Sequence, residues 1–256
     1  MRFGIIGGTG FDSIGNDAEE RIIDTPYGQV AVHVTSLGGQ EVAFIARHGR
    51  DHVIPPHLVN YRANIAALKS LGVTRVLASA AVGSLNTIMQ PGDFVLPVQF
   101  VDFTRARHST FYDGAGEVRH IDVTVPYCPQ LRDALQHAGT FLGGDLHPAA
   151  VYVCTEGPRF ETPAEIEMFQ RLGGDIVGMT GVPEAPLARE AGMCYAALAV
   201  VTNWAAGLAE GPLEHDAISS QMDDQMATLK RLFTGVIESW QEQPCRTCAP
   251  GSSEAA

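Results

Sequence analysis

Residues 195–202 most constrain the fold, because they are apolar almost throughout and carry no charge. A strand that is apolar on both faces is typical of the centre of a parallel sheet with helices on both sides. Further strand-like runs at residues 3–6, 75–80 and 150–154 alternate with stretches that favour helix, such as 164–172. This alternation predicts a single α/β domain with a central mixed, largely parallel sheet flanked by helices.

Turn and helix signals predict the elements between these strands. Residues 29–35 and 41–46 flank a Gly-Gly pair and predict a β-hairpin. A helix is expected over residues 55–70, where two prolines begin it, and a long one over 215–240. Residues 103–120 are polar and aromatic with little periodicity, which predicts a long ordered loop of the kind that often carries function.

Composition argues against several classes of function. The chain has 256 residues, a net charge of −12 and a pI near 5.1, and an acidic surface argues against binding to nucleic acid. No apolar run approaches the ~20 residues that a membrane helix needs, so no membrane association is expected. The N-terminus opens as a strand without a signal-peptide pattern, and we expect a cytoplasmic protein.

The C-terminal residues differ from the rest of the chain. We expect one domain over residues 1–242 and a flexible tail over 243–256, in which Cys245 and Cys248 form a Cys-x-x-Cys pair. One such pair lacks the second half of a zinc site, so a tail disulfide or free thiols are expected, and no metal. Cys128, Cys154 and Cys194 are interpreted as small core residues.

Polar loops follow the expected strands, at the sheet edge where α/β proteins bind ligands. The loop 7–10 is rich in glycine and can cradle phosphate with backbone N–H groups, and Thr9 adds a hydroxyl. A nicotinamide dinucleotide is disfavoured, because the glycines do not fit the full fingerprint and Asp24 falls in a turn signal rather than at a strand end. Arg47 and His48 follow a strand and suggest an anion site, the alternative being an exposed basic turn.

The loop 155–165 places Phe160 beside Glu161, between a strand and a helix. A flat heterocycle could stack on the ring while the carboxylate accepts hydrogen bonds from its N–H groups. A solvated Glu in a polar loop is the alternative. Asn203, at the end of the apolar strand 195–202, brings a second polar group to the sheet edge and favours the heterocycle.

Six short motifs occur between residues 7 and 184, within a resemblance that runs from residue 4 to about 240: Gly7-Gly8-Thr9-Gly10, Arg47-His48-Gly49, Gly83-Ser84-Leu85, Pro91-Gly92-Asp93, Glu156-Gly157-Pro158-Arg159-Phe160 and Met179-Thr180-Gly181-Val182-Pro183-Glu184. Together they resemble the trimeric purine nucleoside phosphorylases, and most closely their methylthioadenosine phosphorylase branch. The resemblance implies the nucleoside phosphorylase fold and phosphorolysis, in which phosphate and a purine nucleoside give a pentose 1-phosphate and a free base. It implies a homotrimer, with a hexamer as the alternative, and no cofactor besides inorganic phosphate as co-substrate.

The resemblance assigns site residues position by position. The phosphate site maps to Thr9, Arg47, His48, Thr180 and the main chain near Ala81. Many members carry a hydroxyl residue where this chain has Ala80, so we expect a weaker phosphate contact at this position. The nucleoside site maps to Phe160 near the base, Met179 and His52 near the ribose, and His120 from a neighbouring subunit.

The base site departs from the methylthioadenosine branch, which has Asp at the positions of Asn203 and Ala205. Here Asn203 can donate to purine N7 and a 6-oxo group, while Glu161 accepts from N1–H. A 6-aminopurine would turn its N1 lone pair toward that carboxylate, and such a mismatch can cost ~10⁴-fold in discrimination. We therefore expect inosine and guanosine as substrates, with Asn203, Glu161 and His48 as catalytic residues.

The 5′ end of the nucleoside leaves alternatives open. His215 matches a histidine that binds the ribose 5′-hydroxyl, or it is an exposed residue near a helix start. S-methyl-5′-thioinosine is therefore a second candidate substrate. Methylthioadenosine phosphorylase, a purine nucleosidase that uses water, and a binding module without catalysis are further alternatives.

Overall fold

The computed structural model describes residues 1–256 except 12, 15–16, 115, 141–145, 212, 214, 246 and 249–256. For residues 215–217 it describes the backbone but not the side chains. Its strands are β1 (Phe3–Gly7), β2 (Glu19–Thr25), β3 (Gly28–Leu37), β4 (Gln40–Ala46), β5 (Arg75–Ser84), β6 (Phe94–Phe103), β7 (Leu146–Thr155), β8 (Ile176–Gly178) and β9 (Cys194–Trp204). Its α-helices are α1 (Tyr61–Ser70), α2 (Pro129–Thr140), α3 (Pro163–Arg171), α4 (Gly181–Glu190) and α5 (His215–Ser239). Short 3₁₀ helices occur at Arg50–His52 and Pro56–Leu58.

The strands form one mixed sheet in the order β2-β3-β4-β1-β5-β8-β7-β6-β9. β9 pairs with β6 and also runs parallel to β5 along its whole length, so the last five strands of this order close on themselves. β1 runs parallel to both β4 and β5, and β7 runs parallel to both β6 and β8. The predicted fold class is confirmed, whereas the closure of the sheet has no signal in the sequence pattern.

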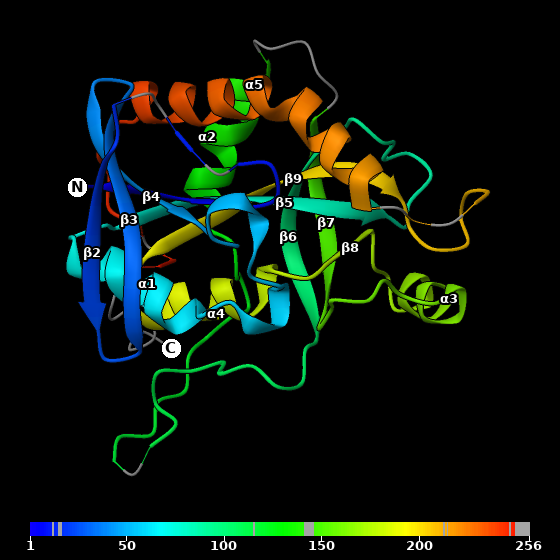
Figure 1. The fold of residues 1–256 in the computed structure, drawn as a ribbon, viewed down its shortest axis with the longest axis horizontal. Coiled ribbons are helices and arrows are strands. Elements are labelled where there is room, and N and C mark those ends of the chain that lie inside the picture. Colours follow the sequence, from blue (N-terminus) through cyan, green and yellow to red (C-terminus); the bar gives the residue numbers. More distant parts are fainter. Residues whose placement is uncertain are drawn as a thin grey trace.

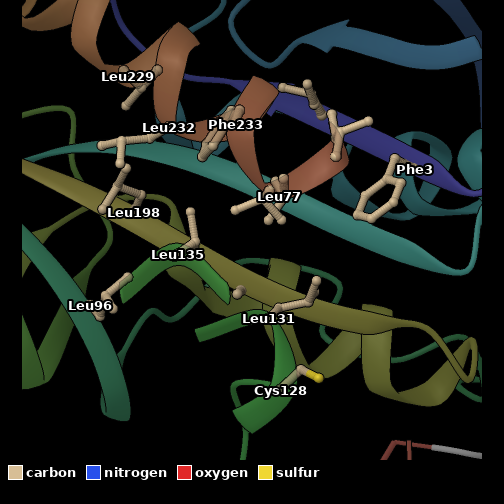
Figure 2. Packing of buried hydrophobic residues seen from close by; sticks show 14 of the residues in the cluster. Phe3, Leu77, Leu96, Cys128, Leu131, Leu135, Leu198, Leu229, Leu232 and Phe233 are labelled. Carbon is tan, nitrogen blue, oxygen red and sulfur yellow. The ribbon is translucent and has the colours of Figure 1, made fainter. Parts of the chain in front are cut away.

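Helices cover both faces of the sheet, α2 and α5 on one side and α1 and α4 on the other (Figure 1). Alternate residues of β9 point to opposite faces. Leu198 packs with residues of α2 and α5, such as Leu135 and Phe233 in Figure 2, whereas Ala197 belongs to the cluster that contains residues of α1 and α4. Burial on both faces explains why β9 is apolar throughout.

Two local expectations were wrong. The helix expected over residues 55–70 is interrupted, because Val59 is extended and Asn60 caps α1 by accepting a hydrogen bond of 3.1 Å from the Ala63 N–H. Asp24 lies at the end of β2 and not in a turn, because β2 pairs with β3 as far as Thr25. Its carboxylate accepts a hydrogen bond from Gln29, the residue opposite on β3.

The described part of the expected tail packs against the domain. Cys245 and Cys248 are 8% and 4% exposed and belong to the same core cluster as Cys128 and Cys194. Within the described residues, none of the helices combines the length and apolar character that crossing a membrane requires.

Candidate active site

A cavity of about 310 Å³ lies where the carboxyl ends of β5 and β9 meet the loops that follow β1, β4, β7 and β8. The predicted site residues that line it are Thr9, Arg47, His48, His52, Ala81, Phe160, Glu161, Met179, Thr180, Asn203 and Ala205. His120 instead lines a separate cavity, together with Tyr27 and Glu190. The side chain of His215 lies outside the described residues, so its role stays a prediction.

Arg47 lines the cavity and forms a buried ion pair with Glu184. The two side chains are 1% and 0% exposed. Arg47 Nε and Nη2 donate to the two carboxylate oxygens at 2.8 and 2.7 Å, and Nη1 donates to the Ser79 carbonyl at 2.8 Å. Burial alone would lower the pKa of Arg47, but the charge and hydrogen bonds of Glu184 outweigh it and raise the pKa, so the guanidinium stays charged. Three of its five N–H groups are used, which leaves two for a ligand.

The glycine loop after β1 passes directly over this guanidinium. A Cβ at Gly8 would lie 2.9 Å from both Arg47 Nη1 and the Ser79 carbonyl, so only glycine allows this approach. The Gly8 N–H donates to Ser79 Oγ at 2.8 Å, which fixes the loop beside Thr9. Because Thr9 and the Arg47 guanidinium both line the cavity, the loop can hold an anion there.

Thr180 reaches the same cavity from the junction of β8 and α4. It is the N-cap residue of α4, and its hydroxyl makes no capping hydrogen bond. Its backbone N–H lies 3.3 Å from the Tyr152 hydroxyl, to which it donates. Val182 has φ −119° and ψ 131°, so the regular part of α4 begins after it, and Thr180 offers its hydroxyl to a ligand rather than a helix N-terminus. The predicted phosphate residues therefore meet at one place, with cationic and neutral donors around it.

The two histidines after β4 lie in a tight turn beside the cavity. His48 Nδ1 is 2.8 Å from the Ile54 carbonyl, which can only accept, so Nδ1 carries the proton. The His48 and His52 rings stack in parallel, with centroids 4.5 Å apart and an angle of 8°. Asp51 and His52 have backbone φ values of 63° and 55°. Residues other than glycine rarely adopt such values, so the surrounding structure must stabilise this turn.

Asn203 reaches the cavity from the carboxyl end of β9. Its Oδ1 accepts from the Thr202 hydroxyl at 2.8 Å, and its Nδ2 donates to the Trp204 carbonyl at 2.8 Å. These bonds orient the amide and leave one N–H for a ligand. Thr202 is an extra residue of β9 in its pairing with β5, and the resulting register shift sets Gly83 opposite Asn203, where a Cβ on Gly83 would lie 3.3 Å from Asn203 Nδ2. Glycine at this position therefore gives the amide room.

Glu161 and Phe160 enter the cavity from the loop between β7 and α3. Glu161 Oε1 accepts from the Thr155 hydroxyl at 2.7 Å, so a group at the end of β7 fixes the carboxylate. Both residues are half-buried, and both can still contact a ligand. An aromatic face beside an oriented carboxylate suits a planar ring with N–H groups on its edge.

Arg107 holds this loop in place from the long segment after β6. Its side chain is 2% exposed, and it donates to the Val182 carbonyl at 2.6 Å and the Glu156 carbonyl at 2.8 Å. Gly157 has φ 67°, and a Cβ there would lie 2.5 Å from the sulfur of Met179. The loop therefore rests directly on Met179, the residue predicted to contact the ribose.

Comparison with known proteins adds the decisive observation. The family model described as "Phosphorylase superfamily" matches residues 2–238. This chain belongs to that superfamily. The family resemblance carried by the six motifs is confirmed.

Named relatives in the phosphorylase superfamily are similar to most of the chain. The 6-oxopurine nucleoside phosphorylase of Pyrococcus furiosus is 50% identical over 243 residues, with 92% of each chain covered. A protein of Methanopyrus kandleri named "Probable S-methyl-5'-thioinosine phosphorylase" is 51% identical over 236 residues, with 92% of this chain and 86% of the relative covered. The structure of methylthioadenosine phosphorylase from Schistosoma mansoni with adenine is 34% identical and gives a TM-score of 0.88, covering 92% of this chain and 90% of that one.

Sequence reasoning missed three residues that position the site of this superfamily member: Ser79, Arg107 and Glu184. Glu184 is the only acidic residue of the otherwise apolar stretch 182–188, and an isolated charge of that kind signals a buried partner. Arg107 had no comparable signal, because the segment around it contains other basic residues. Ser79 is 0% exposed, and only its approach to Gly8 and Arg47 gives it a role.

Proposed function

We propose that the protein catalyses the phosphorolysis of 6-oxopurine nucleosides, inosine and guanosine, to the free base and ribose 1-phosphate. One observation carries the proposal: Arg47, Thr9 and Thr180 line the same cavity as Glu161 and Asn203. The first three suit phosphate, and the last two suit the edge of a lactam-type purine. The 6-oxopurine nucleoside phosphorylase named above, at 50% identity, supports the same substrate class.

Phosphate is the nucleophile in the proposed mechanism. Thr9, Thr180 and the two remaining N–H groups of Arg47 hold it, and His48 helps to position it. A phosphate oxygen forms a bond to C1′ as the C1′–N9 bond breaks and its electron pair passes to the purine. The negative phosphate stabilises the positive charge that develops on the ribose, and binding both reactants in one cavity supplies the proximity.

Asn203 and Glu161 stabilise the leaving base. Its negative charge spreads over the ring, and the free amide N–H of Asn203 donates to N7. Glu161 accepts from N1–H, which a 6-oxopurine has and a 6-aminopurine lacks. Because Thr155 and Thr202 already orient both groups, little reorganisation is needed as the charge develops.

S-methyl-5′-thioinosine is a second candidate substrate. Val53, Leu213 and Ile218 also line the cavity, and an apolar lining suits a methylthio group better than a hydroxyl. The name of the Methanopyrus kandleri relative supports this alternative.

One assay separates these functions. Inosine, guanosine, S-methyl-5′-thioinosine and adenosine are each incubated with and without phosphate, and base release is measured by chromatography. The proposal expects hypoxanthine and guanine only with phosphate, and adenosine slower by ~10³-fold or more. Base release without phosphate would identify a nucleosidase. Nucleoside binding without base release would identify a binding module. Equal rates of base release from adenosine and inosine would contradict the proposed base recognition.

We further propose that the enzyme is a homotrimer, or a hexamer of two trimers, in which the loop that ends at His120 completes the nucleoside site of a neighbouring subunit. The location of His120 outside its own active-site cavity supports this. Analytical ultracentrifugation gives the oligomeric state. Mixing inactive Asn203→Ala chains with His120→Ala chains should restore activity only if the site is shared.

A further inference from the structure

Four cysteines that are remote in the sequence gather at one buried position. They are Cys128, Cys194, Cys245 and Cys248, and their Sγ atoms all lie within 4.8 Å of one another. Cys128 directly precedes α2, Cys194 begins β9, and the other two come from the C-terminal segment. All four are free thiols and all four are buried. The fold therefore supplies the second half that the Cys-x-x-Cys pair lacks in the sequence.

The spacing of the sulfur atoms fits tetrahedral coordination of one metal ion. Zinc–sulfur bonds of about 2.3 Å in a tetrahedron place the sulfur atoms about 3.8 Å apart. Cys128 Sγ and Cys245 Sγ are 3.7 Å apart. A disulfide would bring two of the atoms to about 2.05 Å. If the four cysteines formed two disulfide bonds, no central position for an ion would remain between their sulfur atoms.

The surroundings of the cluster suit a thiolate site. The Arg189 guanidinium donates to the Thr247 carbonyl, between the two tail cysteines, and to the Val125 carbonyl, shortly before Cys128. It thereby ties the two parts of the cluster together and brings a positive charge near a site that four thiolates would make negative.

We propose that these four cysteines bind one Zn²⁺ ion as a structural Cys₄ site. The Cys-x-x-Cys pair has the close ligand spacing that is typical of structural zinc sites, the fold supplies the other two ligands from separate elements, and a closed four-sulfur site has no position for substrate. The ion would join β9, α2 and the C-terminal segment. This proposal differs from the expectation of no metal in the sequence analysis. That expectation followed from the lack of a second ligand pair beside Cys245 and Cys248 in the sequence.

The zinc site is structural rather than catalytic, because the fold separates it from the active site. Cys194 begins β9 and Asn203 lies close to its other end, so about nine residues of extended strand place them ~30 Å apart. Loss of the ion should therefore lower thermal stability while the choice between inosine and adenosine stays the same. This distinction also keeps the site independent of the proposed function.

The full-length protein, made in zinc-supplemented medium and purified under reducing conditions without chelator, tests the inference. Elemental analysis by mass spectrometry should find about one zinc per chain, and the variant Cys245→Ser/Cys248→Ser should hold less than about a tenth of that. Cys154→Ser is the matched control, because Cys154 is buried but lies outside the cluster. This variant protein should keep its full zinc content. The melting temperature of the double variant should fall by ~5–10 °C.

Two further measurements keep the test independent of folding defects in the variants. Wild-type protein exchanged into Co²⁺ should show the visible absorption bands of a tetrahedral thiolate site. Alkylation of the denatured wild type without reductant should find no disulfide. Absence of stoichiometric metal after reduction and zinc addition, zinc retained by the double variant, or iron in place of zinc would each overturn the assignment.

Discussion

Glu184 accepts two parallel hydrogen bonds from Arg47, 137 residues earlier, in an ion pair that is almost wholly shielded from water. The Tyr195 hydroxyl donates a further bond of 2.6 Å to the same carboxylate. A buried ion pair adds little net stability, because desolvation of both charges offsets their attraction. Its value here is orientation, since it fixes the position of a guanidinium that lines the cavity.

The first prediction concerns this pair. Glu184→Gln keeps the shape of the side chain but leaves the Arg47 charge buried without a counter-charge, which should cost about 3–5 kcal/mol in the free energy of unfolding. The KM for phosphate should also change, because Arg47 can now turn. Chemical denaturation and steady-state kinetics measure the two effects. The matched control Glu167→Gln removes an exposed pair with Arg171 and should cost less than about 0.5 kcal/mol. Equal stability of the two variants would contradict the role given to Glu184.

The second prediction concerns Asn203. Asn203→Ala should lower kcat for inosine by ~10²–10³-fold with little change in KM, because its bond to N7 strengthens only as the base becomes anionic. A 7-deaza analogue of inosine has no N7 acceptor and provides the control. The variant and the wild type should turn over this analogue at similar rates. An unchanged kcat for inosine would remove Asn203 from the mechanism.

The third prediction concerns base choice. Asn203→Asp combined with Ala205→Asp restores the two carboxylates of the methylthioadenosine branch and should raise the ratio of kcat/KM for adenosine over inosine by ~10²-fold or more. Ala205 is only 2% exposed, so the variant should also lose stability. Because both substrates compete for the same enzyme in one mixture, the measured ratio does not depend on the folded fraction. A retained preference for inosine would contradict the account of base recognition.

The fourth prediction concerns pH and the loop that carries Phe160 and Glu161. Hydrogen bonds from Arg159, and then from the Thr162 N–H, lower the pKa of Glu165 from 4.5 to about 2. A carboxylate whose pKa is lowered by folding stabilises the folded state above its unfolded pKa and loses that contribution as the pH falls. The stability difference between wild type and Glu165→Gln should therefore be constant above about pH 5 and shrink between pH 4.5 and 2. Arg159→Met, which removes the largest cause, should flatten this dependence in denaturation curves taken across the range.

The sequence by itself determined the parts of the protein that rest on local pattern. The apolar run of β9, the hairpin of β3 and β4, and the glycine loop at Gly8 follow from residue periodicity and turn chemistry, which act over a few neighbouring positions. β1, β4, β5 and β9 run parallel and bring their carboxyl ends to one edge, so the polar residues at those ends could be assigned to one cavity before its geometry was known. β7 and β8 run antiparallel to β5, and only the closure of the sheet brings Glu161 and Thr180 to the same cavity. The break before α1 escaped this reasoning, because Asn60 competes as a cap within a stretch that otherwise favours helix.

Tertiary structure alone decided which remote groups meet. The pairing of β9 with both β5 and β6, the ion pair between Arg47 and Glu184, and the cluster of Cys128 with Cys245 each join segments that no local pattern relates. Such contacts arise when whole helices and strands pack, and the energy of a buried charge or thiol depends on the neighbours that packing supplies. The sequence thus named the chemistry at each strand end, and the three-dimensional packing chose the partners that orient it.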